Sequence, residues 1–299
     1  MTLLLPENSD LYKAASHLAA FDQQNPDPQS RKKQERVLFT RLRKILREDA
    51  YGTWLLIQAQ KRGIKFVIDE QTSALGYYNP DQKTIAVNPR LCQNDNDIMV
   101  GTIAHELVHN TQGKKNIGPS WLFAPRDNVA MLWAMEADAD TGAAVFASRM
   151  KHKRPGIADG IRAMGRGATI DAIEKAVADD PDAIYNGTAA RAAFDAWYTL
   201  TRLKDIYGQQ IAGFLGSSVD KFIKHLQDSG QISKTGKICI EHRPMLRDWL
   251  EMLGDMPDLD GRKIRNYLRG TTKRNIDDAY YREGLSPFTE IQIQFVEMK

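Results

Sequence analysis

The sequence His105-Glu106-Leu107-Val108-His109 decides how its surroundings can fold and what they can do. On a helix, residues four positions apart lie on one face, so the imidazoles of His105 and His109 can point at one place. Glu106 lies one position round the helix, within reach of a water molecule held at that place. This is the spacing at which two histidines bind zinc and a glutamate acts as a general base.

The residues around this stretch predict a helix over 94–113. Asn94, Asp95 or Asp97 can cap its start, and Gly113 can end it. We expect one face to be buried, because apolar residues recur at helical spacing. These residues are Met99, Val100, Ile103, Leu107 and Val108.

A second helix is predicted over 127–151, and it carries Glu136 and Asp140 four residues apart on one face. A catalytic zinc site has three protein ligands and one open position, so a third ligand is expected from another element. Glu136 is the candidate. The Asp140 carboxylate can accept a hydrogen bond from the outer ring nitrogen of a zinc-bound histidine and fix its tautomer.

The pair of patterns H-E-x-x-H and E-x-x-x-D resembles the gluzincins, the thermolysin-like branch of the zinc metallopeptidases. Three shorter stretches also resemble an uncharacterised bacterial family of compact proteins regarded as metallopeptidases. They are 76–80, 84–88 and 104–106, and the likeness covers about residues 55–150.

The resemblance implies a zinc metalloendopeptidase that acts on a peptide or protein substrate. It implies one catalytic Zn²⁺ with His105, His109 and Glu136 as ligands, Glu106 as the base, and Asp140 as the partner of a ligand histidine. No residue matches the oxyanion-stabilising histidine or tyrosine of the gluzincins. The candidates for that role are His225, His242, Tyr185, Tyr198 and Tyr207.

Three β-rich stretches predict short strands at 64–68, 75–78 and 83–87. The last two would form a hairpin joined by residues 79–82. In the peptidases that the resemblance implies, a strand at this place lies along the cleft, and an extended peptide can add to its free edge. The alternative is that the hairpin only covers the apolar face of the metal-binding helix.

The expected fold is α+β and predominantly helical, with a zincin-like core in which a small sheet packs on the helix of the two histidines. We expect N-terminal helices in 1–62, the metallopeptidase core in 63–150 and a mostly helical region in 151–299. The boundary at 151 rests on a basic break, Lys151 to Gly156. Further helices are predicted at 9–21, 30–47, 51–61, 157–166, 170–178, 189–207, 209–215, 219–227, 243–253 and 261–268, and a loose or strand-like tail at 291–296.

Several other features have an ordinary structural interpretation, which we favour. The basic residues between 31 and 47 form a solvated helix face rather than a site for an acidic partner. Residues 121–123, Trp-Leu-Phe, fill the core rather than line a pocket. Cys92 is a small buried thiol, Asp255–Gly261 is a turn, and Asp138 faces solvent or caps locally.

Composition places the 299-residue chain among ordinary soluble proteins, with 42% hydrophobic residues and a formal net charge of +3. This charge creates no strong field, so neither a membrane nor a nucleic-acid partner is expected. Two cysteines fit a reduced compartment. The first residues lack a charged n-region and a long apolar run, so we expect no signal peptide. We therefore expect a cytoplasmic location, with leaderless export left open.

Two alternatives to a peptidase remain from the sequence. The first is a catalytically inactive, zinc-stabilised interaction module whose helical second half binds a partner. The second is a regulatory protein that acts on nucleic acid through the basic helix. No nucleic-acid recognition motif supports the second alternative.

Overall fold

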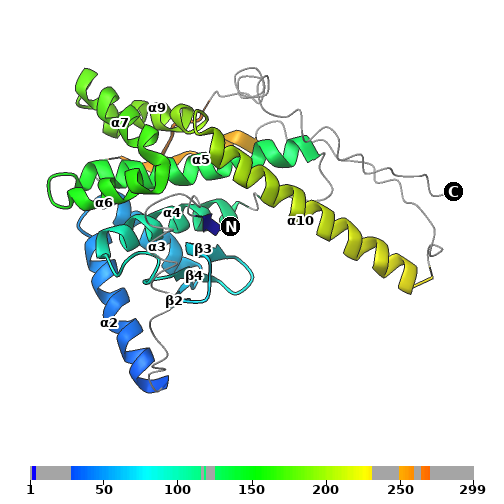
Figure 1. Cartoon of the computed structure of the whole chain (residues 1–299). Coiled ribbons are helices and arrows are strands. Elements are labelled where there is room, and N and C mark those ends of the chain that lie inside the picture. The colour runs from blue at the N-terminus through cyan, green and yellow to red at the C-terminus, as the bar shows by residue number, and fades with distance from the viewer. Residues whose placement is uncertain are drawn as a thin grey trace. The chain divides into compact units, whose positions relative to one another are not determined.

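The computed structural model describes residues 2–4, 28–115, 118, 125–230, 249–258 and 264–269. These residues form a mostly helical protein with a small mixed sheet, as the sequence predicted (Figure 1). The helix predicted at 9–21, the loose or strand-like tail at 291–296, residues 121–123 and His242 lie outside the described residues. Within the described residues, no helix combines the length and the apolar character that a membrane span needs.

The chain divides into two compact units, each assembled from separate segments. Unit 1 comprises Met1–Asn116, Ala137–Leu200 and Gly254–Tyr267, and unit 2 comprises Ile117–Glu136, Thr201–Leu253 and Leu268–Lys299. Neither unit coincides with one of the three predicted parts, 1–62, 63–150 and 151–299. That division therefore stays a prediction about which parts fold independently.

A four-stranded sheet in unit 1 has the strand order β1-β3-β4-β2. Its strands are β1 (Thr2–Leu4), β2 (Lys65–Ile68), β3 (Ala74–Asn79) and β4 (Thr84–Val87). The predicted hairpin is formed by β3 and β4, which are antiparallel, while β2 runs parallel to β4. The expectation of a free edge on this hairpin is wrong, because β1 pairs antiparallel with β3 and leaves both hairpin strands with a neighbour on each side.

The central helix of unit 1 is α4 (Asn96–Lys114), which begins at the N-cap Asp95. The Asp95 carboxylate accepts hydrogen bonds from the backbone N–H groups of Asp97 and Ile98, at 2.7 and 3.2 Å. Figure 1 shows α4 between the sheet and α6 (Pro155–Ile161), with α3 (Ala50–Lys61) beside it. As a result every residue from 99 to 110 is buried, and not only the one face that the apolar periodicity predicted.

A second long helix, α5 (Pro125–Met150), continues without a break from the segment that ends at Glu136 into the segment that begins at Ala137. It packs closely against α4 at Gly142. A Cβ atom at Gly142 would lie 2.5 Å from Cγ2 of Val108 and 2.6 Å from the hydroxyl of Tyr51. The absence of a side chain at this position therefore allows the two helices to approach.

The remaining helices of unit 1 precede and follow this pair. They are α2 (Pro28–Leu46), the π-helical turn η1 (Arg162–Arg166), α7 (Gly167–Asp179), α8 (Ala183–Asn186) and α9 (Thr188–Trp197). The helix that the sequence predicted over 157–166 is regular only as far as Ile161, and η1 follows it. Gly165 within η1 has φ 79°, which breaks the helical path before α7.

Several predictions for the second half of the chain are wrong. The helix predicted at 189–207 is interrupted, since α9 ends at Trp197 and α10 (Thr201–Asp228) begins four residues later. The two helices predicted at 209–215 and 219–227 are both part of α10. The helix predicted at 261–268 is instead the strand β6 (Ile264–Asn266), which pairs antiparallel with β5 (Asp255–Pro257), so the turn predicted at 255–261 is partly a strand.

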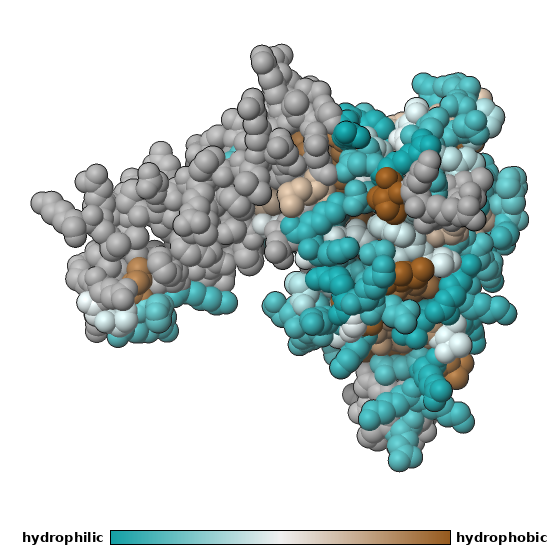
Figure 2. Space-filling model, turned by 180° about the vertical axis from the view of Figure 1, so that it is seen from behind, coloured by the Kyte–Doolittle hydropathy of each residue, from teal (hydrophilic) through white to brown (hydrophobic). Residues whose placement is uncertain are grey.

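The surface of the described residues is mainly hydrophilic on the face that Figure 2 shows, with small and separate apolar patches. Among large hydrophobic side chains, only Val37, Ile57 and Ile264 are exposed within the described part of the chain. The described residues also include one short 3-10 helix, η2 (Trp249–Met252).

Candidate metal centre

The two histidines of α4 are buried and face each other. Their Nε2 atoms lie 3.0 Å apart, and their rings meet edge to face with centroids 4.7 Å apart. His105 and His109 are one helical turn apart, so the helix itself sets this arrangement. The sequence predicted that both imidazoles would point at one place.

Glu136 of α5 joins this pair. One ligand atom from each of His105, His109 and Glu136 lies within 4.8 Å of the other two, and all three residues are buried. The structure therefore brings together the three residues that the sequence analysis proposed as metal ligands. Two imidazoles and a carboxylate can hold a divalent metal ion.

The outer nitrogen of His105 contacts Asp140, one helical turn beyond Glu136. His105 Nδ1 lies 2.8 Å from Asp140 Oδ1. The same carboxylate accepts hydrogen bonds from Arg166 Nε at 2.9 Å and from Trp197 Nε1 at 2.8 Å. Burial alone would raise the pKa of Asp140, but the Arg166 charge, His105 and Trp197 outweigh it and lower the pKa to about 2. Asp140 is thus a carboxylate that accepts the Nδ1–H of His105.

The outer nitrogen of His109 contacts an amide instead. His109 Nδ1 lies 2.8 Å from Gln112 Oε1, and Gln112 Nε2 donates to Asp138 Oδ2 at 2.8 Å. Asp138 Oδ1 accepts from the backbone N–H of Gly254 at 3.1 Å and from the hydroxyl of Tyr267 at 2.5 Å. Because the Gln112 amino group is directed at Asp138, its carbonyl oxygen is directed at His109 and accepts the Nδ1–H.

The prediction that Asp138 faces solvent or caps locally is wrong, because its partners are distant in sequence. It is buried, with 5% of its surface exposed. Burial raises the pKa of Asp138, while the hydrogen bonds from Tyr267 and Gln112 lower it. The expectation failed because the donors that surround this carboxylate come from residues 26, 116 and 129 positions away.

These hydrogen bonds fix the tautomer of both histidines. Each ring donates through Nδ1–H, so each Nε2 presents a lone pair towards the other at 3.0 Å. Two lone pairs at this distance repel unless a cation lies between them, either a metal ion or a proton. The arrangement thus fits a metal ion on the shared side of the two rings.

Glu106 lies beside His105 and is fully buried. Strand β3 approaches it at Gly76, where an added Cβ atom would lie 3.7 Å from Glu106 Cγ, 2.8 Å from the Ala86 carbonyl oxygen and 2.7 Å from Thr102 Cγ2. A side chain at position 76 would therefore force β3 away from α4. The glycine keeps the strand next to the glutamate.

Cys92 is a buried free thiol, as the sequence predicted. Burial raises its pKa to about 12, so it is protonated at neutral pH. Its Sγ lies 3.8 Å from the carbonyl oxygen of Leu75, which accepts a weak hydrogen bond.

The residues proposed for oxyanion stabilisation, as far as the structure describes them, belong to different elements. His225 is exposed near the end of α10, and Tyr185 lies under the guanidinium of Arg149, 5.5 Å from its ring centroid. Tyr198 and Tyr207 are buried. The assignment of an oxyanion-stabilising residue stays a prediction.

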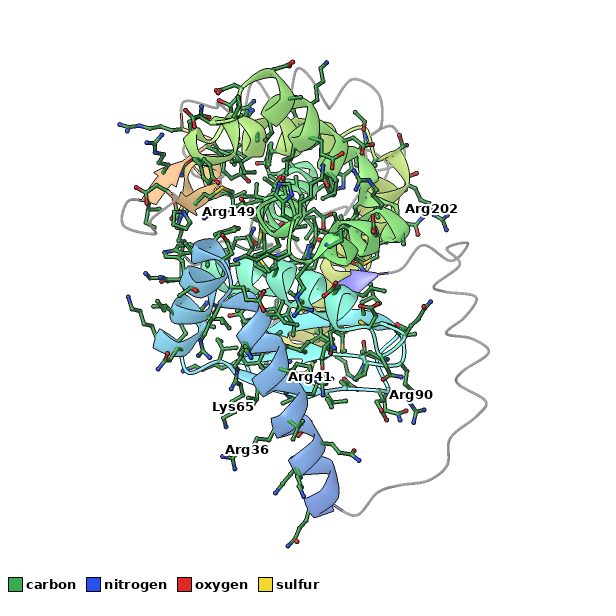
Figure 3. The ribbon with its side chains drawn as sticks, turned by 90° about the vertical axis from the view of Figure 1, so that its left-hand side faces the viewer. Arg36, Arg41, Lys65, Arg90, Arg149 and Arg202 are labelled. Carbon is green, nitrogen blue, oxygen red and sulfur yellow. The ribbon has the colours of Figure 1, made fainter. Side chains whose placement is uncertain are left out.

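The basic helix α2 behaves as a solvated helix face. Arg36 and Arg41 are exposed and project from α2 in Figure 3. Arg43 instead packs over the ring of Phe66, with 4.7 Å between its guanidinium carbon and the ring centroid. Most basic side chains of this helix therefore face solvent, while Arg43 packs against strand β2.

Four residues around the ligands escaped the sequence analysis. Gln112 lies three residues after His109 on the same helix, so helical spacing alone could have indicated it. Arg166, Trp197 and Tyr267 carry no such signal, because they are 26, 57 and 129 residues from the carboxylates that they contact.

The fold and the site together define a helical α+β protein with a buried group of two histidines and a glutamate suited to a metal ion. Residues 13–258 match the sequence model of a family described as "Putative metallopeptidase family (DUF6782)", and the chain belongs to this family. A comparison with curated proteins and a comparison with solved structures found no match.

Proposed function

We propose that the protein is a zinc-dependent peptidase of the gluzincin type, with His105, His109 and Glu136 as the ligands of one catalytic Zn²⁺. The observation that carries the proposal is the buried convergence of these three side chains, within 4.8 Å of one another. Membership of a metallopeptidase family supports a peptide or protein as the substrate.

The donor set favours zinc among divalent metals. Two histidines and a glutamate form the ligand set of well-known zinc peptidase sites. His105 and His109 would hold the ion through Nε2, because these two atoms lie 3.0 Å apart and the Nδ1 of each ring faces a hydrogen-bond acceptor.

Zinc in such a site lowers the pKa of a bound water from about 15.7 to about 7 and polarises a carbonyl oxygen. Glu106 accepts the proton of the attacking water and then delivers it to the leaving amine. Its full burial keeps bulk water from competing for that proton. Asp140 holds the ring of His105 in the tautomer that leaves Nε2 free to bind the metal.

The first experiment separates catalysis from metal binding. The wild-type protein and Glu106→Gln are loaded with zinc, their metal content is measured by mass spectrometry, and both are incubated with a peptide library. We expect equal zinc content and a loss of cleavage of about 10²–10⁴-fold in the variant, because the general base is absent. Undiminished cleavage by Glu106→Gln would exclude Glu106 as the base.

The second experiment tests the third ligand. Glu136→Ala should lose stoichiometric zinc, because only two protein ligands remain. Full zinc content in this variant would exclude Glu136 as a ligand. If the zinc-loaded wild type cleaves no peptide in the library, the catalytic proposal fails and the zinc-stabilised interaction module becomes the better description.

A further inference from the structure

Each of the two histidines has its own carboxylate, and both carboxylates come from α5. Asp140 contacts His105 directly, whereas Asp138 reaches His109 through the side chain of Gln112. On a helix, Asp138 lies away from the face shared by residues 136 and 140. The side-chain amide of Gln112 lies between His109 and Asp138 and hydrogen-bonds to both, so the carboxylate does not contact the histidine directly.

We propose that Gln112, Asp138 and Tyr267 form a positioning chain that holds His109 as a metal ligand, and that the segment Gly254–Tyr267 thereby sets the metal affinity of the site. This inference rests on the metal site of the proposed function. None of the three residues touches the metal or the substrate in this scheme. They act through the orientation of the His109 ring.

The first link of the chain is the orientation of Gln112. Its amino group donates to Asp138 Oδ2 at 2.8 Å, which leaves its carbonyl oxygen as the only group that can face His109 Nδ1. If the amide were reversed, its N–H would meet the His109 Nδ1–H, and the ring would have to turn or change tautomer. Both changes withdraw the Nε2 lone pair from the shared site.

The second link is the pair of donors to Asp138 Oδ1. Gly254 precedes β5 and Tyr267 follows β6, so both lie at the same end of this antiparallel pair. The backbone N–H of Gly254 and the hydroxyl of Tyr267 therefore meet at this one oxygen. They fix the plane of a buried carboxylate, and that plane determines where Oδ2 accepts from Gln112. A buried carboxylate that loses a donor reorients or loses stability.

The β5–β6 pair is also tied to the end of α4 that follows His109. Lys115, the C-cap of α4, forms an ion pair with Asp255 at 2.6 Å. The Tyr267 ring packs against Phe194 of α9, with centroids 6.1 Å apart. These two contacts add to the two hydrogen bonds to Asp138, so the segment Gly254–Tyr267 is anchored within unit 1 at several points.

The test is zinc affinity, measured by competition with a chromogenic chelator in the full-length protein. Gln112→Met keeps the length of the side chain but removes the amide, and we expect binding about 10–100-fold weaker. Tyr267→Phe keeps the ring and removes the hydroxyl, and we expect a smaller loss in the same direction. The matched control is Tyr77→Phe, which removes a similar bond, from the Tyr77 hydroxyl to Asp69 Oδ2 at 2.8 Å, and should leave affinity unchanged.

The double variant Gln112→Met with Tyr267→Phe distinguishes a chain from separate structural effects. If Tyr267 acts through Gln112, removing its hydroxyl should weaken zinc binding no further once the amide is gone. Additive losses would overturn the chain, and so would wild-type affinity in a folded Gln112→Met protein. If Gln112→Met does not fold, Tyr267→Phe decides, and wild-type affinity there overturns the inference.

The zinc content of the wild type distinguishes failure of the proposed metal site from failure of the positioning chain. If the wild type binds no zinc, the metal site itself fails, and this inference fails with it. If the wild type binds zinc and all variants bind it equally well, only the positioning chain is rejected. Hydrolysis of peptides is not needed for either reading.

Discussion

The two histidines of the metal centre are supported in different ways. His105 contacts a carboxylate whose other hydrogen bonds come from a guanidinium and an indole. His109 contacts a neutral amide, and the carboxylate behind that amide is held by a backbone N–H and a phenol. The group that contacts His105 is a negatively charged carboxylate paired with Arg166. The group that contacts His109 is a neutral amide.

This difference indicates how each support should respond to change. Removing a partner from a buried ion pair leaves an uncompensated charge, which costs more than losing a neutral hydrogen bond. Substitutions around His105 should therefore lower the free energy of unfolding more than substitutions around His109. The orientation of His109 depends on a segment that is distant in sequence, so it should respond more strongly to changes in the β5–β6 pair.

The largest effect is expected from Asp140→Asn, which leaves the buried Arg166 guanidinium without its counter-ion. The free energy of unfolding should fall by about 3–5 kcal/mol, measured by urea denaturation of the metal-free protein. The matched control is Asp171→Asn. Asp171 is an exposed partner of Arg162, so the change should cost about 0–1 kcal/mol. Equal losses in the two variants would contradict the difference between the supports.

A smaller loss of stability is expected from Gly142→Ala, which changes the packing of α5 against α4, the helix that carries both histidines. The added methyl group meets Val108 and Tyr51 at 2.5 and 2.6 Å and should push α5 away from α4 at a cost of about 1–3 kcal/mol. Gly101→Ala is the control in α4, where the nearest atom would lie 3.5 Å away. Thermal or urea unfolding should show that this control is neutral or stabilised. A tolerated Gly142→Ala would show that the helices can separate freely.

A still smaller effect is expected from Lys115→Met, which removes one anchor of the β5–β6 pair. The ion pair with Asp255 is partly exposed, so its loss should cost about 0.2–1 kcal/mol. Zinc affinity should change little, because Gly254 and Tyr267 still donate to Asp138. A loss of affinity as large as that of Gln112→Met would mean that the ion pair, rather than the Asp138 contacts, controls His109.

The smallest effect is expected at Cys92, a buried residue that supports neither histidine. Burial raises the pKa of its thiol to about 12, so the reactive thiolate is scarce at pH 8. In a Cys239→Ser background, a thiol reagent should label the native protein slowly and the unfolded protein at once. Rapid labelling of the native protein would show that this part of unit 1 opens readily.

The sequence anticipated the elements that carry the metal ligands better than the contacts behind them. The predicted helices at 94–113 and 127–151 correspond to α4 and α5 within a few residues. The predictions at 189–207 and 261–268 failed. Helical periodicity does not show where Trp197 ends a helix or that 264–266 pair with 255–257.

Local spacing along the chain already places His105 and His109 on one helix face and Glu136 and Asp140 on another, because helical periodicity is a local property. The distant residues that complete the site follow only from the packing of the folded chain. Arg166 and Trp197 reach Asp140, and Tyr267 reaches Asp138, from up to 129 residues away. Such contacts depend on how packed elements bring remote side chains together, and no periodicity in the sequence encodes them.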